Sequence, residues 1–223
     1  MEEQQQTGAF VVFFGRDTHL SVVTDEVLNI SRAFSRSYYQ GVDIDLPGVD
    51  VMPTGLTEAY LRDQDYWNIL PLLHSPKQST QRVLAAAGAH WNITNTDRSA
   101  VQALCASSHK PPEIDCTISK ENWWARLHAS THILNPLGNG LQSPKFFEAL
   151  LMRTIPVCTR HLVFQKLFDQ DWPMILVDDF TVLLDEGVLV NETRRAQEKM
   201  SRHFAQLSNV YGLWAYLHEG RFR

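Results

Sequence analysis

One stretch constrains the fold of this chain more than any other: residues 131–158, THILNPLGNGLQSPKFFEALLMRTIPVC. It begins with a short apolar run that stops at Asn135-Pro136, and after a glycine-containing loop it resumes at Ser143 with apolar side chains at helical spacing. A second apolar run, Ile155–Cys158, follows the predicted helix. The stretch therefore predicts a strand, a loop, a helix and a second strand, which would pair in parallel through a right-handed crossover.

The loop and the start of the helix have residues suited to binding an anion. Gly138, Asn139 and Gly140 tolerate backbone conformations and close approaches that most residues do not. Ser143 is a preferred helix N-cap, and Pro144 is a preferred first helical residue. We expect the loop to lie at the carboxyl end of the first strand, where open α/β sheets bind anionic ligands at the free N–H groups of a helix.

Two charged residues extend this interpretation. Lys145, in the first turn, can offset the charge of a diphosphate, and Ser143 can give it a hydroxyl and an N–H group. Glu148 lies one turn into the helix, where a carboxylate would repel phosphate but would accept hydrogen bonds from the hydroxyls of a ribose or a sugar. By spacing alone Glu148 is a solvated helix residue. The residues around it favour hydroxyl binding, although Gly-x-Gly lacks the rest of the dinucleotide fingerprint.

The loop and the helix together resemble the nucleotide-sugar-binding signature of exostosin-type glycosyltransferases, and the matching residues are Pro136, Gly138, Gly140, Ser143, Lys145, Glu148 and the run Ile155-Pro156-Val157. Residues 167–180, LFDQDWPMILVDDF, resemble the segment that follows this signature in the family. The similarity covers residues 65–200 and is strong from 131 to 190.

The resemblance implies an α/β fold with a Rossmann-like parallel sheet and flanking helices, forming the second half of a GT-B architecture. It implies a glycosyltransferase that moves a hexosyl or pentosyl group from a nucleoside-diphosphate sugar, UDP-linked, to a glycan or glycoprotein hydroxyl, with inversion and without a metal or a separate cofactor. The residues that it assigns to the donor site are Arg82, Pro136, Gly138, Asn139, Gly140, Ser143, Lys145 and Glu148.

Three departures from the family pattern leave an alternative open. Leu137 stands where an arginine is common, Gln142 where an acidic residue is common, and Lys145 where arginine is usual. Lysine keeps one charge but lacks the planar fork that grips a diphosphate at two points. The alternative is a truncated, catalytically inactive module for nucleotide-sugar binding or scaffolding. An unrelated Rossmann-like nucleotide hydrolase is less well supported, because a Walker lysine motif and a serine nucleophile elbow are absent.

The resemblance also suggests a domain division. The run Val49–Val51 and the turn Pro53-x-Gly55-Leu56 resemble the strand and turn that these enzymes carry near their domain junction. We therefore predict that residues 1–60 are the remnant of an N-terminal, acceptor-side α/β domain and that residues 61–223 form the nucleotide-sugar-binding domain. Inverting transfer also needs a general base, which generally comes from the N-terminal domain.

Residue spacing predicts the remaining elements. The expected strands are 9–14, buried and parallel, then 70–75, the first of the second domain, and 174–177; the expected helices are 24–39, 79–89, 97–107, 119–129, 180–189 and 192–218. Arg82 falls in the first turn of the helix at 79–89, where the resemblance places a basic residue facing the diphosphate.

Asp17 and His19 are the only early candidates for the general base. The other polar and aromatic residues favour structural roles. The Trp123-Trp124 pair is more typical of a core than of a base-stacking platform, and His132 is more typical of a satisfied core residue. The Asp178-Asp179 pair fits a helix cap better than a metal site.

Composition limits the classes of protein to which the chain can belong. A chain of 223 residues with 44% hydrophobic content can bury a substantial core, and its net charge of -5 disfavours nucleic acid as a partner. Its three cysteines have no CxxC spacing, which argues against zinc and is compatible with a reducing compartment, although Cys105 and Cys116 can pair in a lumenal protein.

The early apolar run is too short for a signal peptide or a membrane span, so the chain as written is expected to be soluble and to lack a membrane anchor. Because relatives of the resembled type are usually anchored by an upstream segment, the resemblance implies the Golgi or secretory lumen if this chain is part of a longer family member.

Overall fold

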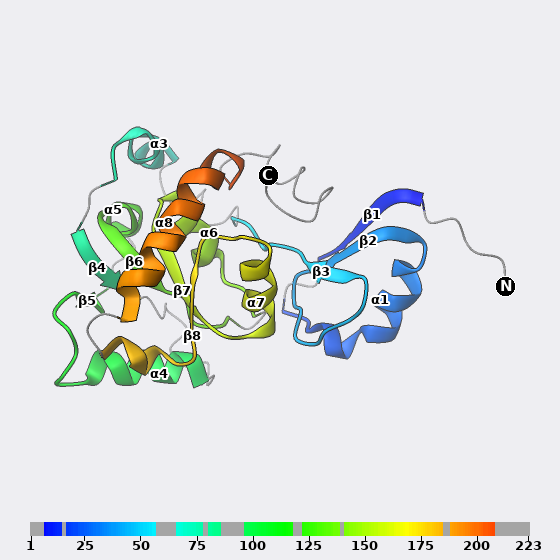
Figure 1. Cartoon of the computed structure of the whole chain (residues 1–223), viewed down its shortest axis with the longest axis horizontal. Helices are drawn as coiled ribbons and strands as arrows, with labels where there is room; N and C mark the ends of the chain where they lie inside the picture. The colour runs from blue at the N-terminus through cyan, green and yellow to red at the C-terminus, as the bar shows by residue number, and fades with distance from the viewer. Residues whose placement is uncertain are drawn as a thin grey trace.

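The structure, a computed structural model, describes residues 7–14, 17–56, 66–77, 80–85, 96–117, 122–138, 141–184 and 188–207. Its strands form two parallel sheets flanked by helices, which confirms the α/β class (Figure 1). The sheets lie on either side of the boundary predicted near residue 60, and we call residues 7–56 the small unit and residues 66–207 the large unit. The division into an acceptor-side remnant and a donor domain stays a prediction.

The small unit contains a three-stranded sheet with the order β1-β2-β3. Its elements are β1 (Thr7–Phe13), the 3-10 turn η1 (Leu20–Val22), α1 (Thr24–Ser31), β2 (Phe34–Tyr39) and β3 (Val49–Val51). The strand expected at 9–14 is parallel as predicted, but it is an edge strand with half-buried side chains rather than a buried one.

The helix expected over residues 24–39 is wrong beyond Ser31, because the chain turns and forms the central strand β2. Tyr38 and Tyr39 are buried in this strand, where aromatic side chains pack well. Ile30, which was expected to face the core of a long helix, is 47% exposed. Tertiary packing of the two tyrosines therefore overrides the helical spacing.

The large unit contains a five-stranded sheet with the order β5-β4-β6-β7-β8. The strands are β4 (Thr80–Leu84), β5 (Ile114–Asp115), β6 (Ser130–Leu134), β7 (Ile155–Thr159) and β8 (Ile175–Val177). The unit predicted over residues 131–158 is confirmed: β6 and β7 pair in parallel and are connected through α6 (Pro144–Leu151). The last strand, predicted at 174–177, is also confirmed as β8.

At the start of the large unit the predicted strand and helix are interchanged. The strand expected at 70–75 is the end of α3 (Tyr66–His74), which contains Pro71, and the helix expected at 79–89 is replaced at its start by β4. Short apolar runs do not distinguish a strand from a buried helix. Packing decides here, because Ile69 is buried against the helix at 123–129.

The other helices agree with the expectations in part. The helices expected at 97–107 and 119–129 are α4 (Thr96–Ala106) and α5 (Trp123–Ala129), and the 3-10 turn η3 (Phe180–Leu184) replaces the short helix expected at 180–189. Neither β5 nor α7 (Leu162–Asp169) was predicted. The final helix, α8 (Val188–Leu207), begins before residue 192, and residues 208–218 lie outside the described part.

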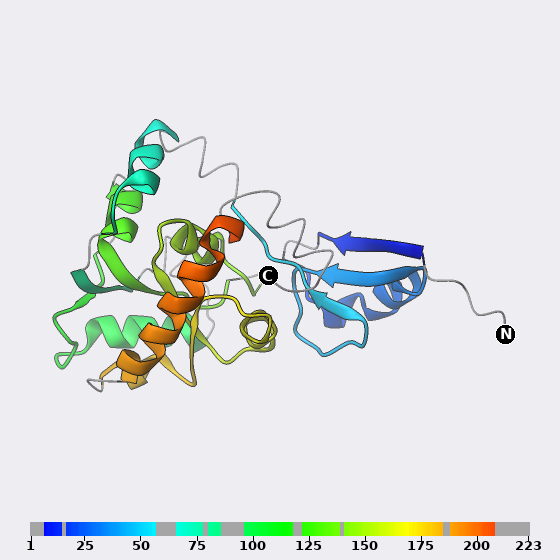
Figure 2. The same ribbon diagram turned by 45° about the horizontal axis from the view of Figure 1, so that its top comes forward.

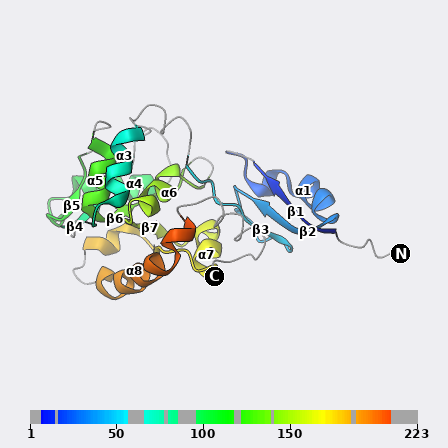
Figure 3. The same cartoon turned by 90° about the horizontal axis from the view of Figure 1, so that it is seen from above.

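Alternating side chains of β6 point to two hydrophobic layers. Ile133 packs with residues of α3, α5 and α6 on one face of the sheet, and Leu134 packs with residues of α4, η3 and α8 on the other. Figure 3 shows α3 and α5 on one side of the sheet and α8 on the opposite side.

A shared core joins the two units. Its buried residues include Tyr38 and Val51 of the small unit and Phe146, Phe164 and Trp172 of the large unit. Helix α7 contacts β3 directly, and α7 lies on the side of the large unit that faces the small sheet (Figure 2). The two sheets are therefore parts of one packed structure.

Polar contacts also cross this junction: Lys166 Nζ lies 2.7 Å from Asp45 Oδ1, and Gln142 makes three hydrogen bonds that we call the Gln142 bridge. The Gln142 amide nitrogen Nε2 donates to the carbonyls of Gln40 at 2.7 Å and Met52 at 2.9 Å. Its oxygen Oε1 accepts from the backbone N–H of Thr54 at 3.0 Å. A carboxylate could accept the Thr54 bond but could not donate the other two. This explains why glutamine stands where the resembled family often has an acidic residue.

Cys105 of α4 and Cys116, just after β5, form a disulfide, whereas Cys158 is a buried free thiol. The lumenal pairing considered from the sequence is therefore the one found. Nowhere in the described ranges does a helix combine the length and hydrophobicity that a bilayer span requires.

We predict that Gln142→Glu lowers the free energy of unfolding by about 2 kcal/mol or more at pH 8. The carbonyls of Gln40 and Met52 would lose their donor, and each unsatisfied buried group costs roughly 1–3 kcal/mol. Urea unfolding measures the change. The control, Gln165→Glu, alters a glutamine whose only side-chain bond shown is the exposed one to Asp169 on α7, and it should change stability by no more than about 0.5 kcal/mol. Equal effects of the two variants would show that the bridge contributes nothing specific.

We also predict that the unreduced, denatured chain reacts with one equivalent of a thiol alkylating reagent and that the reduced chain reacts with three, because only Cys158 is unpaired. Mass spectrometry counts the added groups. The paired variant Cys105→Ser/Cys116→Ser should be about 2–3 kcal/mol less stable than wild type, since the disulfide closes a short loop in the unfolded chain. Three reactive thiols without reduction would contradict the pairing.

Candidate functional site

The loop between β6 and α6 lies at the carboxyl end of β6, as the sequence predicted. Pro136 is buried in this loop. Helix α4 holds both backbone polar groups of Leu137: its N–H donates to Asp97 Oδ2 at 3.2 Å, and its carbonyl accepts from Arg98 Nε at 3.2 Å. Asp97 Oδ2 also accepts from the Thr159 hydroxyl at 2.6 Å, at the end of β7. Two strand ends and the first turn of α4 therefore position the loop.

An antiparallel bridge joins Gly138 to Leu141, with both N···O distances at 3.3 Å. A Cβ atom on Gly138 would lie 2.8 Å from the carbonyl oxygen of Gln142. Gly138 is therefore required for close approach. Gly138 does not have a positive φ, whereas Leu141 has a φ of 68°. Asn139 and Gly140 lie outside the described residues.

Ser143 is the N-cap of α6, as predicted, and Pro144 is the first helical residue. The Ser143 hydroxyl oxygen accepts from the backbone N–H of Lys145 at 3.3 Å, and the Ser143 carbonyl accepts from the N–H of Phe146 at 3.0 Å. The expectation that the helix start offers free N–H groups is therefore wrong for these two groups. An anion at this position would depend mainly on side-chain cations.

Glu148 is buried, at 1% exposed, and is therefore not the solvated helix residue that its spacing alone predicts. Its Oε2 accepts from the indole N–H of Trp123 at 2.7 Å, and its Oε1 is buried without a hydrogen-bond partner. Burial raises the pKa of Glu148, an effect that the Trp123 bond and the charge of Lys145 partly oppose. Trp123 is a core residue as predicted, but its bond to the carboxylate was not anticipated.

Lys145 lies beside this carboxylate, and Arg98 lies within electrostatic reach of Lys145. Lys145 Nζ is 5.9 Å from the centre of the Trp123 ring. Burial lowers the pKa of Lys145 to about 8; Glu148 acts to raise this pKa and Arg98 acts to lower it. Arg98 is 9% exposed, and burial also lowers its pKa. The start of α6 therefore combines two desolvated cations with one carboxylate.

Arg82 does not join this group. It lies in β4 instead of a helical first turn, and its side chain is exposed. Its carbonyl accepts from the Thr131 hydroxyl at 3.1 Å, near the amino end of β6, whereas the loop is at the carboxyl end. Its charge acts instead on Asp115, whose pKa is lowered because hydrogen bonds and nearby arginines outweigh burial.

Arg98, rather than Arg82, is the arginine that contacts this loop. Because β4 is the first strand of the large sheet along the chain, the next helix described along the chain is α4, and its first turn carries Asp97 and Arg98. The sequence reasoning missed both residues. The available signal was the adjacent acidic and basic pair at the start of the helix predicted over 97–107.

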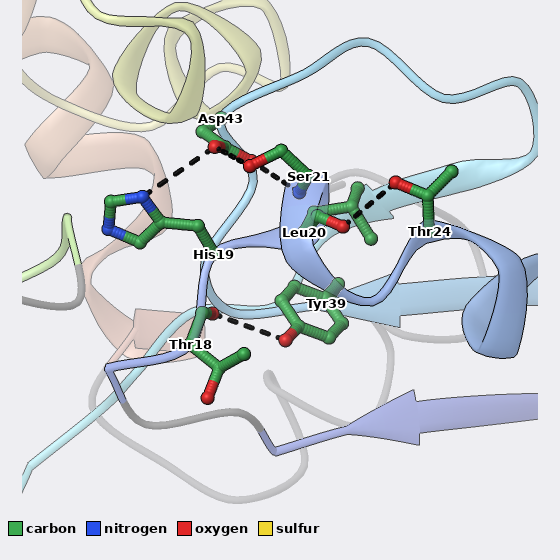
Figure 4. Close-up of polar contacts among 7 residues, drawn as sticks. All are labelled: Thr18, His19, Leu20, Ser21, Thr24, Tyr39 and Asp43. Carbon is green, nitrogen blue, oxygen red and sulfur yellow. Dashed lines mark hydrogen bonds and ion pairs between the residues drawn. The ribbon is translucent and has the colours of Figure 1, made fainter.

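The small unit has a second polar cluster, shown in Figure 4, in which an aspartate connects a histidine and a serine. His19 Nδ1 lies 3.6 Å from Asp43 Oδ2. Ser21 donates its backbone N–H to Asp43 Oδ1 at 2.9 Å and its hydroxyl to Oδ2 at 2.5 Å. Burial acts to raise the pKa of Asp43, but the bonds from Ser21 outweigh it, so this pKa is lowered. Asp43 is therefore ionised at neutral pH.

His161 is within electrostatic reach of groups from both clusters. It follows β7 as the N-cap residue of α7, and its ring nitrogen Nδ1 is buried without a partner. Burial lowers the pKa of His161, while Asp97 and Asp43 act to raise it and His19 acts to lower it. Groups from the loop support and from the small unit are therefore both within electrostatic reach of one imidazole.

The remaining polar candidates have structural roles. His132 is a core residue as expected: its ring nitrogens pair with the hydroxyls of Thr131 and Thr193, and burial lowers its pKa to about 4. Asp179 caps η3 by accepting from the N–H of Thr181 at 2.6 Å, which agrees with the predicted cap. No group of three or more His, Cys, Asp or Glu side chains suited to a metal occurs among the residues that the structure describes.

Comparison with other proteins gives no identification, since no protein-family model and no curated protein matches the chain. The functional argument therefore depends on the site itself.

We predict that Glu148→Gln stabilises the protein increasingly as pH rises above 4.5. Because burial raises the pKa of Glu148 above its ordinary value of 4.5, its protonated form is favoured in the folded chain. The resulting stability is fully present below pH 4.5 and is lost as pH rises through the raised pKa, whereas glutamine keeps an uncharged acceptor for Trp123. Urea unfolding at pH 4 to 8 measures both proteins. A stability difference that does not change with pH would contradict the prediction.

Proposed function

We propose that the chain is the nucleotide-sugar-binding part of an exostosin-like, GT-B-type glycosyltransferase. It would transfer a sugar from a nucleoside-diphosphate sugar, UDP-linked, to a hydroxyl of a glycan or glycoprotein. The observation that carries the proposal is a combination near the start of α6: a buried carboxylate oxygen of Glu148 without a partner, the neighbouring Lys145, and Arg98 within electrostatic reach of Lys145. A ligand with both a diphosphate and sugar hydroxyls complements this combination.

The electrostatic part of the argument favours an anion. Lys145 and Arg98 act on each other as like charges, and burial makes the charged form of each less favourable. A diphosphate next to them would compensate for the lost solvation with an opposite charge. This electrostatic attraction is stronger in a site that holds little water. The Leu137 contacts keep Arg98 at the loop, so the two cations can act on one ligand.

The hydrogen-bonding part favours a hydroxyl donor. A buried oxygen without a partner costs free energy, and a ligand hydroxyl that donates to Glu148 Oε1 would recover it. Because Glu148 is 1% exposed, a ligand can reach this oxygen only after neighbouring side chains move. Lys145, which lies over Trp123, is the side chain that a diphosphate would attract away from this position.

In the reaction that the family resemblance implies, these cations would stabilise the nucleoside diphosphate as it leaves. The disulfide between Cys105 and Cys116 supports a place in an oxidising compartment such as the Golgi or secretory lumen, where such bonds persist.

A second candidate function is a non-catalytic module derived from such an enzyme. Two observations favour it: the first N–H groups of α6 are already bonded to Ser143, and Glu148 is covered. In this module Lys145, Trp123 and Glu148 would be a buried polar network that contributes to stability only. The two candidates differ in whether the chain binds and turns over a nucleotide sugar.

Isothermal titration calorimetry with UDP-glucose, UDP-galactose, UDP-glucuronic acid and UDP-N-acetylglucosamine tests the proposal. We expect one of these to bind, and we expect Lys145→Met to weaken binding by about 10- to 100-fold, because a charge-assisted hydrogen bond contributes roughly 1.5–3 kcal/mol. Glu148→Gln should weaken the binding of the sugar nucleotide more than that of UDP.

The control is Glu198→Ala, on the exposed face of α8, which should leave affinity unchanged. Absence of heat with all four donors would contradict the proposed function. Binding that is equal in wild type and Lys145→Met would place the ligand elsewhere on the protein.

A further inference from the structure

We propose that His19 is the general base that deprotonates the acceptor hydroxyl and that Asp43 positions its ring. The proposal rests on the glycosyl transfer proposed above and adds the residue that such a transfer requires from the small unit. It is carried by the cluster in Figure 4, which neither the loop at 135–143 nor the packing of the core explains.

The geometry suits a base that is oriented by a carboxylate. Asp43 Oδ2 lies 3.6 Å from Nδ1 of His19, and Figure 4 shows the other ring nitrogen on the side away from Asp43. Two hydrogen bonds from Ser21 fix the Asp43 carboxylate and favour its charged form. A carboxylate beside one ring nitrogen can position the ring so that the other nitrogen meets a substrate hydroxyl. The His19 side chain is 39% exposed, so a substrate hydroxyl can approach it.

Hydrogen bonds and a close backbone contact hold together the two segments that carry His19 and Asp43. The N–H of Leu20 donates to the Gly41 carbonyl at 2.8 Å, and the Tyr39 hydroxyl donates to the Thr18 carbonyl at 3.2 Å. A Cβ atom on Gly41 would lie 2.4 Å from the Thr18 carbonyl oxygen, so only glycine allows this approach. The histidine and the aspartate come from two segments that are held together at several points, which is the support that a catalytic pair needs.

Two sets of contacts connect the pair to the proposed donor site. Asp43 is three residues beyond Gln40, whose carbonyl is part of the Gln142 bridge, and Gln142 belongs to the donor loop. His161, at the end of β7, is within electrostatic reach of His19 and Asp43 and also of Asp97, which holds Leu137. A base on the small unit is therefore close to the loop that would hold the donor on the large unit.

The other histidine–carboxylate pair in the described ranges fits a structural role better. His203 Nε2 bonds Asp171 Oδ2 at 2.7 Å, but Asp171 is also paired with Lys199 and His203 is 3% exposed, so it cannot meet a substrate. Asp17, the second early candidate from the sequence, is exposed.

The reaction balances without a further reagent. The second ring nitrogen of His19 takes the proton of the acceptor O–H as that oxygen bonds to the anomeric carbon of the donor. The bond from the anomeric carbon to the diphosphate breaks, and the electron pair leaves with the nucleoside diphosphate next to Lys145 and Arg98. The imidazolium then returns its proton to solvent. Attack from the side opposite the leaving group inverts the anomeric carbon.

Hydrolysis of the four UDP sugars, with water as acceptor, tests the proposal on the full chain by measuring UDP release and, separately, donor Kd. We expect His19→Ala to lower the release rate by about 100-fold or more, with donor Kd within about twofold of wild type, because the base acts on the acceptor only. Added imidazole should restore part of the lost rate in His19→Ala. Asp43→Asn should lower kcat by about tenfold and leave KM unchanged, because it alters the orientation of the base.

His109→Ala, an exposed histidine after α4, is the matched control and should behave as wild type. Thermal unfolding confirms that each variant is folded. Wild-type release rates in His19→Ala would overturn the proposal, and so would a loss that imidazole does not restore. Donor binding by wild type without any UDP release would overturn the general base while leaving donor binding intact. Failure of wild type to bind any of the four donors would instead overturn the proposed function and, with it, this inference.

Discussion

The Gln142 bridge is the polar contact that fixes the loop before α6 against the small unit, beside the hydrophobic core that the two units share. One amide group satisfies two carbonyls and one N–H of the small unit, and it projects from the loop that precedes α6. These backbone groups are buried at the junction, where they have little access to water, so leaving them unpaired would be costly. The same residue therefore fixes the loop of the candidate donor site and the position of the segment that leads to Asp43.

Buried charge is the second theme of the candidate site. Glu148, Lys145 and Arg98 are all largely removed from water, and their pKa values are shifted in the directions that burial dictates. Buried charged groups rarely add to folding stability, since apolar side chains of similar size usually stabilise a core equally well. Perturbed ionisable groups next to a loop at the carboxyl edge of a parallel sheet are instead typical of binding sites.

The sequence predicted the part of the fold whose signals agree with one another. Over residues 131–158 apolar spacing, the N-cap Ser143 and the helix-starting Pro144 all indicate one arrangement, and the structure has it. Predictions from residue spacing alone had mixed outcomes: α4, α5 and β8 were found, whereas residues 24–39 include a strand that begins at Phe34, and the run at 70–75 is helical. Both errors come from packing partners that are distant in sequence.

Only those features of the site that depend on residues near in sequence could be predicted. The loop and the cap follow from neighbouring residues. The burial of Glu148 depends on Trp123, and the anchoring of Leu137 depends on Asp97 and Arg98, 40 and 39 residues earlier in the chain. The meeting of His19 with Asp43 requires the strand β2, which residue spacing had concealed.

Helix α4 links two features that were described separately. Near its last turn Cys105 is bonded covalently to Cys116, and its first turn grips the backbone of Leu137. Helix α4 therefore connects the Cys105–Cys116 disulfide to the loop. A molecule made under reducing conditions would keep the helix but would lack the disulfide that holds its C-terminal end. Formation of the disulfide would therefore influence how rigidly the helix holds the loop.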